Sequence, residues 1–356
     1  MNKLHTMRRP YLINYLLLGL ILYVVGFECQ PVLAQDAHFS QFAQTPLLVN
    51  PALTGFFKGD NRAQLNYRNQ WKSVGVPFTT YALSYDMVVL KKKWDASYLG
   101  VGFFAFNDKA GDTQFSSTQF NLSVSGIVAL NKAHSVSAGL QGGFAQNSIN
   151  SSALQWGNQF EDGIYDPSLA SGETGDLSPY SYGDFSAGIS WNYQLSEALM
   201  TNAGVALYHI NRPSQEFATS SLERLYSKLV VHLNGHIGIK NTNWAFRPSV
   251  LFLNQGPSTE INFGSMVRYQ LKEGSKYTGH IKESALSLGG HYRNGDSLIP
   301  SILLEVANFS LGISYDINVS RLATVSRGRG GVEIALRYIN PNPLKSSPSG
   351  SGPSFM

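Results

Sequence analysis

Large apolar residues alternate with small or polar residues through the stretch Phe309-Ser310-Leu311-Gly312-Ile313-Ser314-Tyr315-Asp316. Successive side chains of a β-strand point to opposite faces, so this stretch predicts a strand with one apolar face and one polar face. Residues 183–194, 226–240 and 331–339 repeat the same alternation. Many such segments in one chain predict an all-β fold.

Two all-β architectures fit this alternation. In a soluble sandwich the apolar faces form the core and the polar faces meet water. In an outer-membrane β-barrel the apolar faces meet lipid and the polar faces line the lumen. Composition favours the barrel, because only 14% of the 356 residues are charged, whereas a soluble exterior carries roughly 25–35%. The polar faces hold mainly Ser, Asn, Gly, Gln and Thr, which suit an enclosed lumen.

The alternation predicts a barrel of about fourteen antiparallel strands within residues 63–339. An even number places both ends of the barrel chain on one side of the membrane. Short connections follow most even-numbered strands, whereas the long connections 150–182, 212–225 and 317–330 follow odd-numbered ones. Short turns face the periplasm in such barrels, so we also expect the run Lys91-Lys92-Lys93 in a periplasmic turn. The expected strands are 63–71, 78–88, 97–107, 114–129, 134–149, 183–194, 200–211, 226–240, 244–253, 258–269, 284–293, 298–307, 309–316 and 331–339.

The two ends of the chain lack the strand pattern. Residues 1–34 have the basic start, apolar run and small residues of a signal peptide, with cleavage expected after Ala34. Cleavage would remove the one cysteine, Cys29, and with it any disulfide or thiolate chemistry. Residues 35–62 are expected to plug the lumen or to wrap its periplasmic mouth. Residues 340–356, rich in Pro, Ser and Gly, predict a flexible periplasmic tail.

A search for catalytic or metal chemistry finds little. His232 and His236 share one face of an expected strand and could approach a ligand, but no third metal ligand stands at a useful spacing. The sequence has no nucleophile elbow and no phosphate-binding loop. Its 27 basic and 23 acidic residues are mixed, which does not favour a nucleic-acid partner. We therefore expect no enzyme activity, no metal and no cofactor. Five residues are expected to be polar groups of the lumen: His232, Asn234, His236, Glu333 and Arg337.

Several short motifs follow one another along the chain. They are Phe39-Ser40-Gln41-Phe42, Asn50-Pro51-Ala52-Leu53-Thr54-Gly55, Tyr67-Arg68-Asn69-Gln70-Trp71, Leu288-Gly289-Gly290-His291-Tyr292-Arg293 and Gly330-Gly331-Val332-Glu333-Ile334-Ala335-Leu336-Arg337-Tyr338. In this order they resemble the PorP/SprF family of Bacteroidetes outer-membrane proteins. The resemblance covers about residues 38–339.

The resemblance implies a non-enzymatic barrel of the type IX secretion and gliding machinery. It would support export and surface anchoring of a large adhesin with a type-B C-terminal sorting domain. Its partners would also include periplasmic components of the machinery and the outer-membrane lipid. Two alternatives remain: a channel for small or hydrophobic solutes, and a barrel hydrolase that uses His232 and His236.

One group of motif residues is expected to be structural rather than to touch a partner. Pro51 and Gly55 would fix a turn, and Arg68 would pair with a carboxylate of the lumen such as Glu333. The members of this group are Asn50, Pro51, Gly55, Tyr67, Arg68, Gln70 and Trp71.

Overall fold

The computed structural model describes residues 36–94, 97–111, 113–150, 154–172, 178–215, 223–274 and 283–340. The expected signal peptide with its cleavage after Ala34, and tail residues 341–356, lie outside the described residues.

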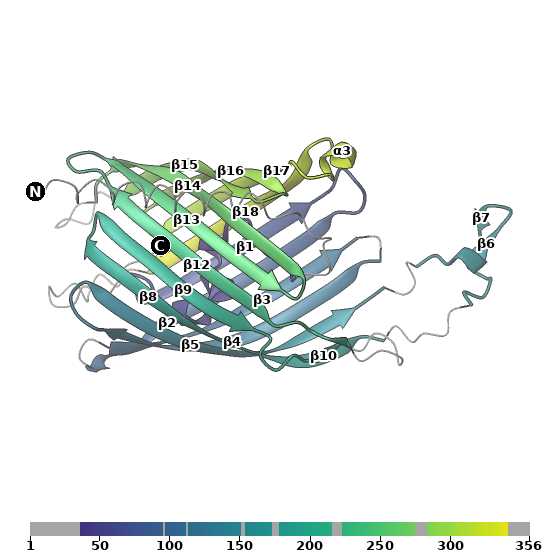
Figure 1. Cartoon of the computed structure of the whole chain (residues 1–356), viewed down its shortest axis with the longest axis horizontal. Coiled ribbons are helices and arrows are strands. Elements are labelled where there is room, and N and C mark those ends of the chain that lie inside the picture. Colours follow the sequence, from purple (N-terminus) through teal and green to yellow (C-terminus); the bar gives the residue numbers. More distant parts are fainter. Residues whose placement is uncertain are drawn as a thin grey trace, which may run out of the picture.

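Fourteen antiparallel strands of the described chain close into a barrel (Figure 1). Each strand pairs with the next barrel strand along the chain, and the last, β18, pairs with the first, β1. This confirms the all-β barrel and its fourteen strands. The barrel strands extend from Asn61 to Asn340, a slightly longer stretch of chain than the expected residues 63–339. The strands are β1 Asn61–Gln70, β2 Phe78–Trp94, β3 Ser97–Ala110, β4 Phe115–Ala129, β5 His134–Ser148, β8 Tyr180–Ser196, β9 Leu199–Tyr208, β12 Lys228–Gly238, β13 Trp244–Gln255, β14 Ser258–Lys272, β15 Ser284–Arg293, β16 Ser297–Val306, β17 Phe309–Asn318 and β18 Arg329–Asn340.

The other elements are short. Two small ribbons stand outside the barrel wall, one formed by β6 and β7 and one by β10 and β11. No helix among the described residues is long and apolar enough to cross a membrane. These elements are η1 Phe42–Gln44, α2 Pro46–Val49, η2 Pro51–Leu53, η4 Gly157–Gln159, β6 Phe160–Glu161, β7 Ile164–Tyr165, β10 Ser214–Gln215, β11 Glu223–Arg224 and α3 Ala323–Ser326.

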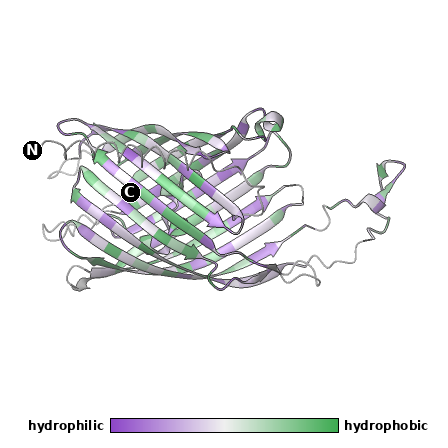
Figure 2. Cartoon of the chain, in the orientation of Figure 1, coloured by the Kyte–Doolittle hydropathy of each residue, from purple (hydrophilic) through white to green (hydrophobic). Residues whose placement is uncertain are grey.

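The alternation in the sequence separates the two faces of the wall. In β17, Leu311 and Ile313 are exposed on the outside, whereas Ser314 and Asp316 are buried on the inside. Figure 2 shows apolar and polar residues alternating along the strands in this way. An outer face this rich in exposed aliphatic side chains suits lipid rather than water.

Aromatic side chains pair near both ends of the wall. Trp244 packs on Tyr269 with ring centroids 4.5 Å apart, and Phe309 packs on Tyr338 at 4.9 Å. At the other end, Trp71 packs on Phe78 at 4.8 Å. Such girdles mark the two interfaces between lipid and water.

The two ends of the barrel differ in their connections. We call the end with the connections 197–198, 239–243 and 307–308 the short-turn end. The opposite end, called the loop end, has the long connections 149–179 and 209–227. In outer-membrane barrels generally, short turns face the periplasm and long loops face the exterior.

The expected turn at Lys91-Lys92-Lys93 is wrong, because this run belongs to the end of β2. The pairing of β2 with β3 is irregular at this run, because it passes from Val89 opposite Leu99 directly to Trp94 opposite Ser97.

Ile302 lies near the middle of β16 on the outer face, where it is 50% exposed and stands opposite Leu288 and Ile313. Changing Ile302 to Arg should lower the free energy of unfolding by about 2–4 kcal/mol, because a guanidinium at the membrane midplane is poorly solvated. The measurement is denaturant unfolding in phospholipid vesicles. Val325→Arg is the matched control, since Val325 is 64% exposed in α3 at the loop end. Equal losses in both variants would contradict a lipid-facing Ile302.

Candidate functional site

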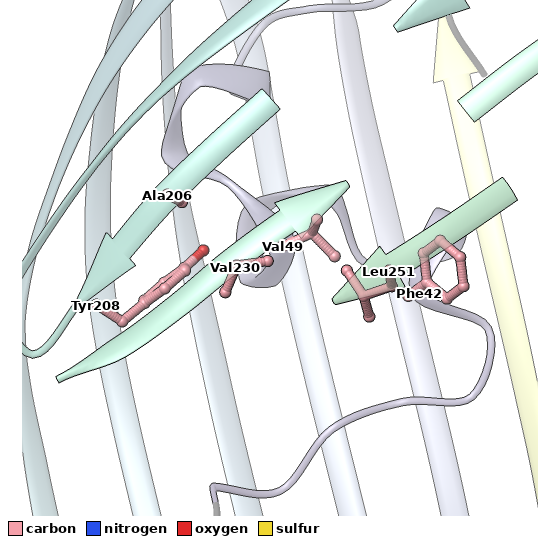
Figure 3. Packing of buried hydrophobic residues seen from close by; sticks show 6 residues of the cluster. All are labelled: Phe42, Val49, Ala206, Tyr208, Val230 and Leu251. Atoms are coloured by element: carbon pink, nitrogen blue, oxygen red, sulfur yellow. The ribbon is translucent and has the colours of Figure 1, made fainter. Parts of the chain in front are cut away.

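Residues 36–60, called here the luminal segment, lie inside the barrel and are mostly buried. Phe42 and Val49 pack on inward-facing residues of β9, β12 and β13, and Figure 3 shows this cluster. Phe39 and Leu47 pack on Ala82, Phe104 and Phe106 of β2 and β3, across the lumen. The luminal segment therefore contacts opposite sides of the wall. The cluster in Figure 3 consists of Phe42, Val49, Ala206, Tyr208, Val230 and Leu251.

Asn50 fastens the middle of the luminal segment to the wall. Its Oδ1 accepts a hydrogen bond from the Ala52 amide at 2.9 Å and so caps η2, in which Pro51 is the first residue. Its Nδ2 donates to the Ile189 carbonyl at 3.0 Å and lies 3.2 Å from His232 Nε2. Asn50 is completely buried, so both ends of its amide are used where water does not reach.

Two wall glycines make room for this contact. A Cβ added at Gly139 would lie 2.4 Å from the Pro51 carbonyl carbon, and one at Gly188 would lie 2.0 Å from Asn50 Oδ1. Any larger residue at either position would push the luminal segment away from the wall.

Gly55 closes the turn that leads into β1. Its φ of +68° favours glycine, and its amide donates to Asp86 Oδ2 at 2.7 Å. Arg62 holds the same carboxylate through two bonds, Nε to Oδ1 at 2.9 Å and Nη2 to Oδ2 at 2.7 Å. This buried bidentate pair fixes the point at which the luminal segment becomes the wall.

Arg68 and Arg293 meet Asp316 inside the loop-end half of the lumen. Their Nη2 atoms lie 2.9 and 3.2 Å from Asp316 Oδ2. Ser40 of the luminal segment donates to Asp316 Oδ1 at 2.8 Å and accepts from Arg293 Nη2 at 2.6 Å. All these side chains are buried. Sequence reasoning missed Asp316, Arg293 and Ser40, although all three lie within the motifs or the alternating strands.

Glu333 accepts two backbone amides of the luminal segment. The Ser40 amide donates to Oε2 at 2.7 Å and the Gln41 amide donates to Oε1 at 2.9 Å. Arg68 Nε lies farther away, at 3.9 Å from Glu333 Oε2. Arg68 thus stands between two carboxylates, and Asp316 is the nearer one.

Asp36 begins the described luminal segment within a second charged group. Its Oδ2 lies 2.6 Å from His209 Nε2 and 2.7 Å from Lys228 Nζ. The other ring nitrogen of His209 lies 3.0 Å from Asp184 Oδ2. Burial alone would raise the pKa of Asp36, but the charges of Lys228 and His209 hold it well below its usual value. Burial would lower the pKa of His209, but Asp36 and Asp184 raise it to about 9.

The remaining sequence candidates do not gather into one site. His232 bonds Asn50, whereas His236 Nδ1 accepts from Arg247 Nε at 3.4 Å. No group of three or more His, Cys, Asp or Glu side chains in the described part of the chain could hold a metal ion. Tyr67 packs on Tyr81, Trp71 packs on Phe78, and Gln70 stands opposite Gly331 of β18.

Two clefts in the described part of the lumen lie against the luminal segment. Leu48 faces the loop-end cleft, whose other lining residues include Asp36, Asp184 and His209, with about 370 Å³ of empty space. Val49 faces the cleft of the short-turn half, with about 440 Å³. Both volumes include some open solvent. Since neighbouring residues of α2 face different clefts, this helix stands between them.

Changing Asp316 to Ala should release the luminal segment, because Arg68 and Arg293 lose a buried partner. Breaking a buried ion pair on one side costs roughly 3–5 kcal/mol. Hydrogen exchange of residues 38–44 should accelerate strongly, as followed by mass spectrometry. Asp296→Ala is the control, since Asp296 also pairs with Arg293 at 2.7 Å but is 37% exposed. Equal exchange in the two variants would contradict the assigned role of Asp316.

The Asp36–His209 contact should depend on pH. Because the pKa of His209 rises to about 9 in the folded chain, its stabilisation is complete below about pH 6.5, the ordinary value, and is lost as pH rises through 9. NMR titration of the imidazole should give a midpoint near 9 in the native barrel. In Asp36→Asn the midpoint should fall, and an unchanged midpoint would contradict the pairing.

Several solved structures align with this chain at TM-scores below 0.5. A Pseudomonas aeruginosa FadL homologue aligns at a TM-score of 0.46 and 10% identity, over 81% of this chain and 92% of that one. The P. putida toluene transporter TodX gives 0.44 and 12%, over 82% and 92%. The CymD monoaromatic hydrocarbon channel gives 0.44 and 15%, over 86% and 94%. The comparison with curated proteins found no match.

The family comparison reaches further. Residues 32–338 match the model of the family described as type IX secretion system membrane protein PorP/SprF. This range includes the luminal segment and almost all of the barrel wall. The chain therefore belongs to the PorP/SprF family of type IX secretion system membrane proteins.

Proposed function

We propose that this barrel is a non-enzymatic anchor of the type IX secretion system. It supports export and surface retention of a large adhesin with a type-B C-terminal sorting domain, and it links that adhesin to periplasmic components. The family assignment supports a secretion role in the outer membrane. In this proposal the chain reaches the outer membrane after its signal peptide is cleaved following Ala34, and residues 35–62 then plug the barrel.

The observation that carries the anchor role is the position of the luminal segment. From Asp36 at the loop-end half it crosses to Asn61 at the short-turn end, and it bonds to the wall along the way. A diffusion channel needs a continuous water-filled path, whereas α2 stands between the two clefts of this lumen. A lumen occupied by chain in this way supports the proposal of a protein that works through its two end surfaces.

Those end surfaces differ in a way that suits two kinds of partner. The loop end presents the long connections 149–179 and 209–227, which hold the two external ribbons. Large loops of outer-membrane barrels face the exterior, where an adhesin would be retained. The short-turn end faces the periplasm by the same rule, where machinery components would dock.

The test is affinity purification of the tagged barrel from detergent-solubilised membranes of the native cell. The expected result is co-purification of a surface adhesin together with periplasmic secretion components. A variant in which a short Gly-Ser linker replaces residues 150–178 should lose the adhesin and keep the periplasmic components. The barrel of this variant should still close, because the loop joins neighbouring strands β5 and β8. If neither class of partner co-purifies with the intact barrel, the anchor proposal is wrong.

Conductance separates the anchor from the channel alternative. The intact barrel should be silent in planar lipid bilayers, and a variant lacking residues 36–58 should conduct, because it lacks most of the luminal segment. Steady conductance by the intact barrel, of the magnitude expected for an open pore of fourteen strands, would favour a channel.

A further inference from the structure

Three guanidinium groups gather inside the barrel near its short-turn end, and we call them the basic cluster. Arg247 Nη1 and Arg268 Nε lie 3.2 and 3.1 Å from Glu305 Oε2. Arg337 Nη2 lies 3.9 Å from Glu305 Oε1. Arg247 and Glu305 lie near strand ends that meet short turns, and Arg337 lies near the last residue of β18. Arg268 lies near the end of β14, before the 273–283 connection. One buried carboxylate thus serves three cations.

The basic cluster keeps a capacity to bind a further anion. Glu283 accepts from Arg268 Nη2 at 2.9 Å, but its side chain is 54% exposed. Arg247 Nη2 is enclosed and has no hydrogen-bond partner among the described residues. Buried guanidinium donors are normally paired. An incoming carboxylate could take the free donor of Arg247.

The two halves of the lumen carry opposite charge. At the loop end, Arg68 and Arg293 are outnumbered by neighbouring carboxylates, whereas the short-turn half has more guanidinium groups than buried carboxylates. An anion arriving from the periplasm therefore meets the favourable half first. The carboxylates at the loop end are Glu260, Asp296, Asp316 and Glu333.

An apolar cleft lies in the same half of the lumen. The luminal segment supplies its apolar floor, and three polar wall residues complete it. Its empty space of about 440 Å³ includes open solvent, so the enclosed part of the cleft is smaller than this volume and suits a single apolar group. The lining residues are Phe42, Ala43, Pro46, Val49, Leu53, Phe56, Arg62, Asn202 and Asn234.

The cleft and the basic cluster adjoin each other on two sides. Asn234 of the cleft is two residues from His236 on β12, and His236 contacts Arg247. On the other side, Arg62 of the cleft is two residues from Gln64, which stands opposite Arg337 in the β1–β18 pair. Residues two apart in a strand share a face. Apolar and cationic surfaces therefore meet at one mouth.

We propose that the cleft and the basic cluster together bind a short peptide segment of a periplasmic partner, in which carboxylate side chains stand beside large apolar ones. One apolar side chain enters the cleft, and a carboxylate bonds Arg247. A free inorganic anion would leave the apolar floor unused. A lipid would have to pass a wall in which every strand is paired on both sides. The inference rests on the proposed function only in placing the short-turn end in the periplasm.

Ala43 offers a clean way to block the cleft. It lines the cleft, and it is exposed, unlike its neighbours Phe42 and Gln44 in η1. Ala43→Trp should occupy part of the cleft without removing a core contact, and Ala198→Trp, at an exposed position of the 197–198 connection outside the cleft, is its matched control. Arg247→Gln removes the charge that faces the peptide while keeping a similar length. Arg321→Glu, an exposed position in the 319–328 connection at the loop end, controls for a change in total charge.

The experiment measures fluorescence anisotropy of a labelled peptide of alternating Asp, Phe and Ser residues. The partner is the purified full-length mature barrel in nanodiscs of zwitterionic lipid. Losing a buried charged contact costs at least about tenfold in affinity, so Arg247→Gln should weaken binding by that factor. Ala43→Trp should also weaken binding about tenfold, because the indole occupies space that the apolar side chain of the peptide would enter. Ala198→Trp and Arg321→Glu should stay within about twofold of the native barrel.

Several results would overturn the inference. Equal binding of a matched peptide with Lys in place of Asp would remove the charge argument. Full displacement of the peptide by inorganic phosphate alone, with no effect of Ala43→Trp, would indicate a plain anion site. Loss of peptide binding in nanodiscs with phosphatidylglycerol would indicate a lipid headgroup. Failure of adhesin co-purification would instead overturn the proposed function and leave this binding measurement intact.

Discussion

The hydrocarbon interior of a membrane cannot form hydrogen bonds, and that constraint governs the rest of this structure. A chain that crosses with strands must pair every backbone group with another strand, so the sheet has to close. Here β1 and β18 meet over ten residue pairs, from Asn61 opposite Asn340 to Gln70 opposite Gly331. Closure fixes an outside that is solvated by lipid and an inside that must be filled by polar groups, water or chain.

The filling of this barrel is part of its own chain. Small inward-facing residues such as Gly139 and Gly188 let the backbone of the luminal segment approach the wall. Buried charges then select one position for it, because Ser40 and Gln41 reach Asp316 and Glu333 only when the luminal segment is in place. Buried ion pairs contribute little net stability but penalise every arrangement that breaks them. The result is a wall and a core that specify each other.

The alternation of Phe309 to Asp316 predicted the fold well, because alternate side chains of one strand face lipid and the lumen. The motif residues also led us to expect that Arg68 pairs with a lumen carboxylate such as Glu333, and Glu333 stands directly opposite Arg68 in the sheet. The alternation could not predict that Asp316 is the nearer partner, because the amides of Ser40 and Gln41 occupy the oxygens of Glu333. Contacts across the lumen, such as Asn50 with His232, depend on a path through space that no local pattern records. His232 and His236 share a face, yet each meets a different neighbour.

The hydrogen bonds from the Ser40 and Gln41 amides to Glu333 have a consequence for the order of assembly. Ser40 precedes every wall strand in the chain, and Glu333 belongs to the last of them. The segment that fills the barrel therefore emerges first during synthesis, and the strand that fastens it emerges last. Contacts between such distant residues form slowly. Closure of the sheet and fixation of the luminal segment therefore occur together, late in folding. A barrel that has not yet closed lacks the bonds that hold the luminal segment in its lumen.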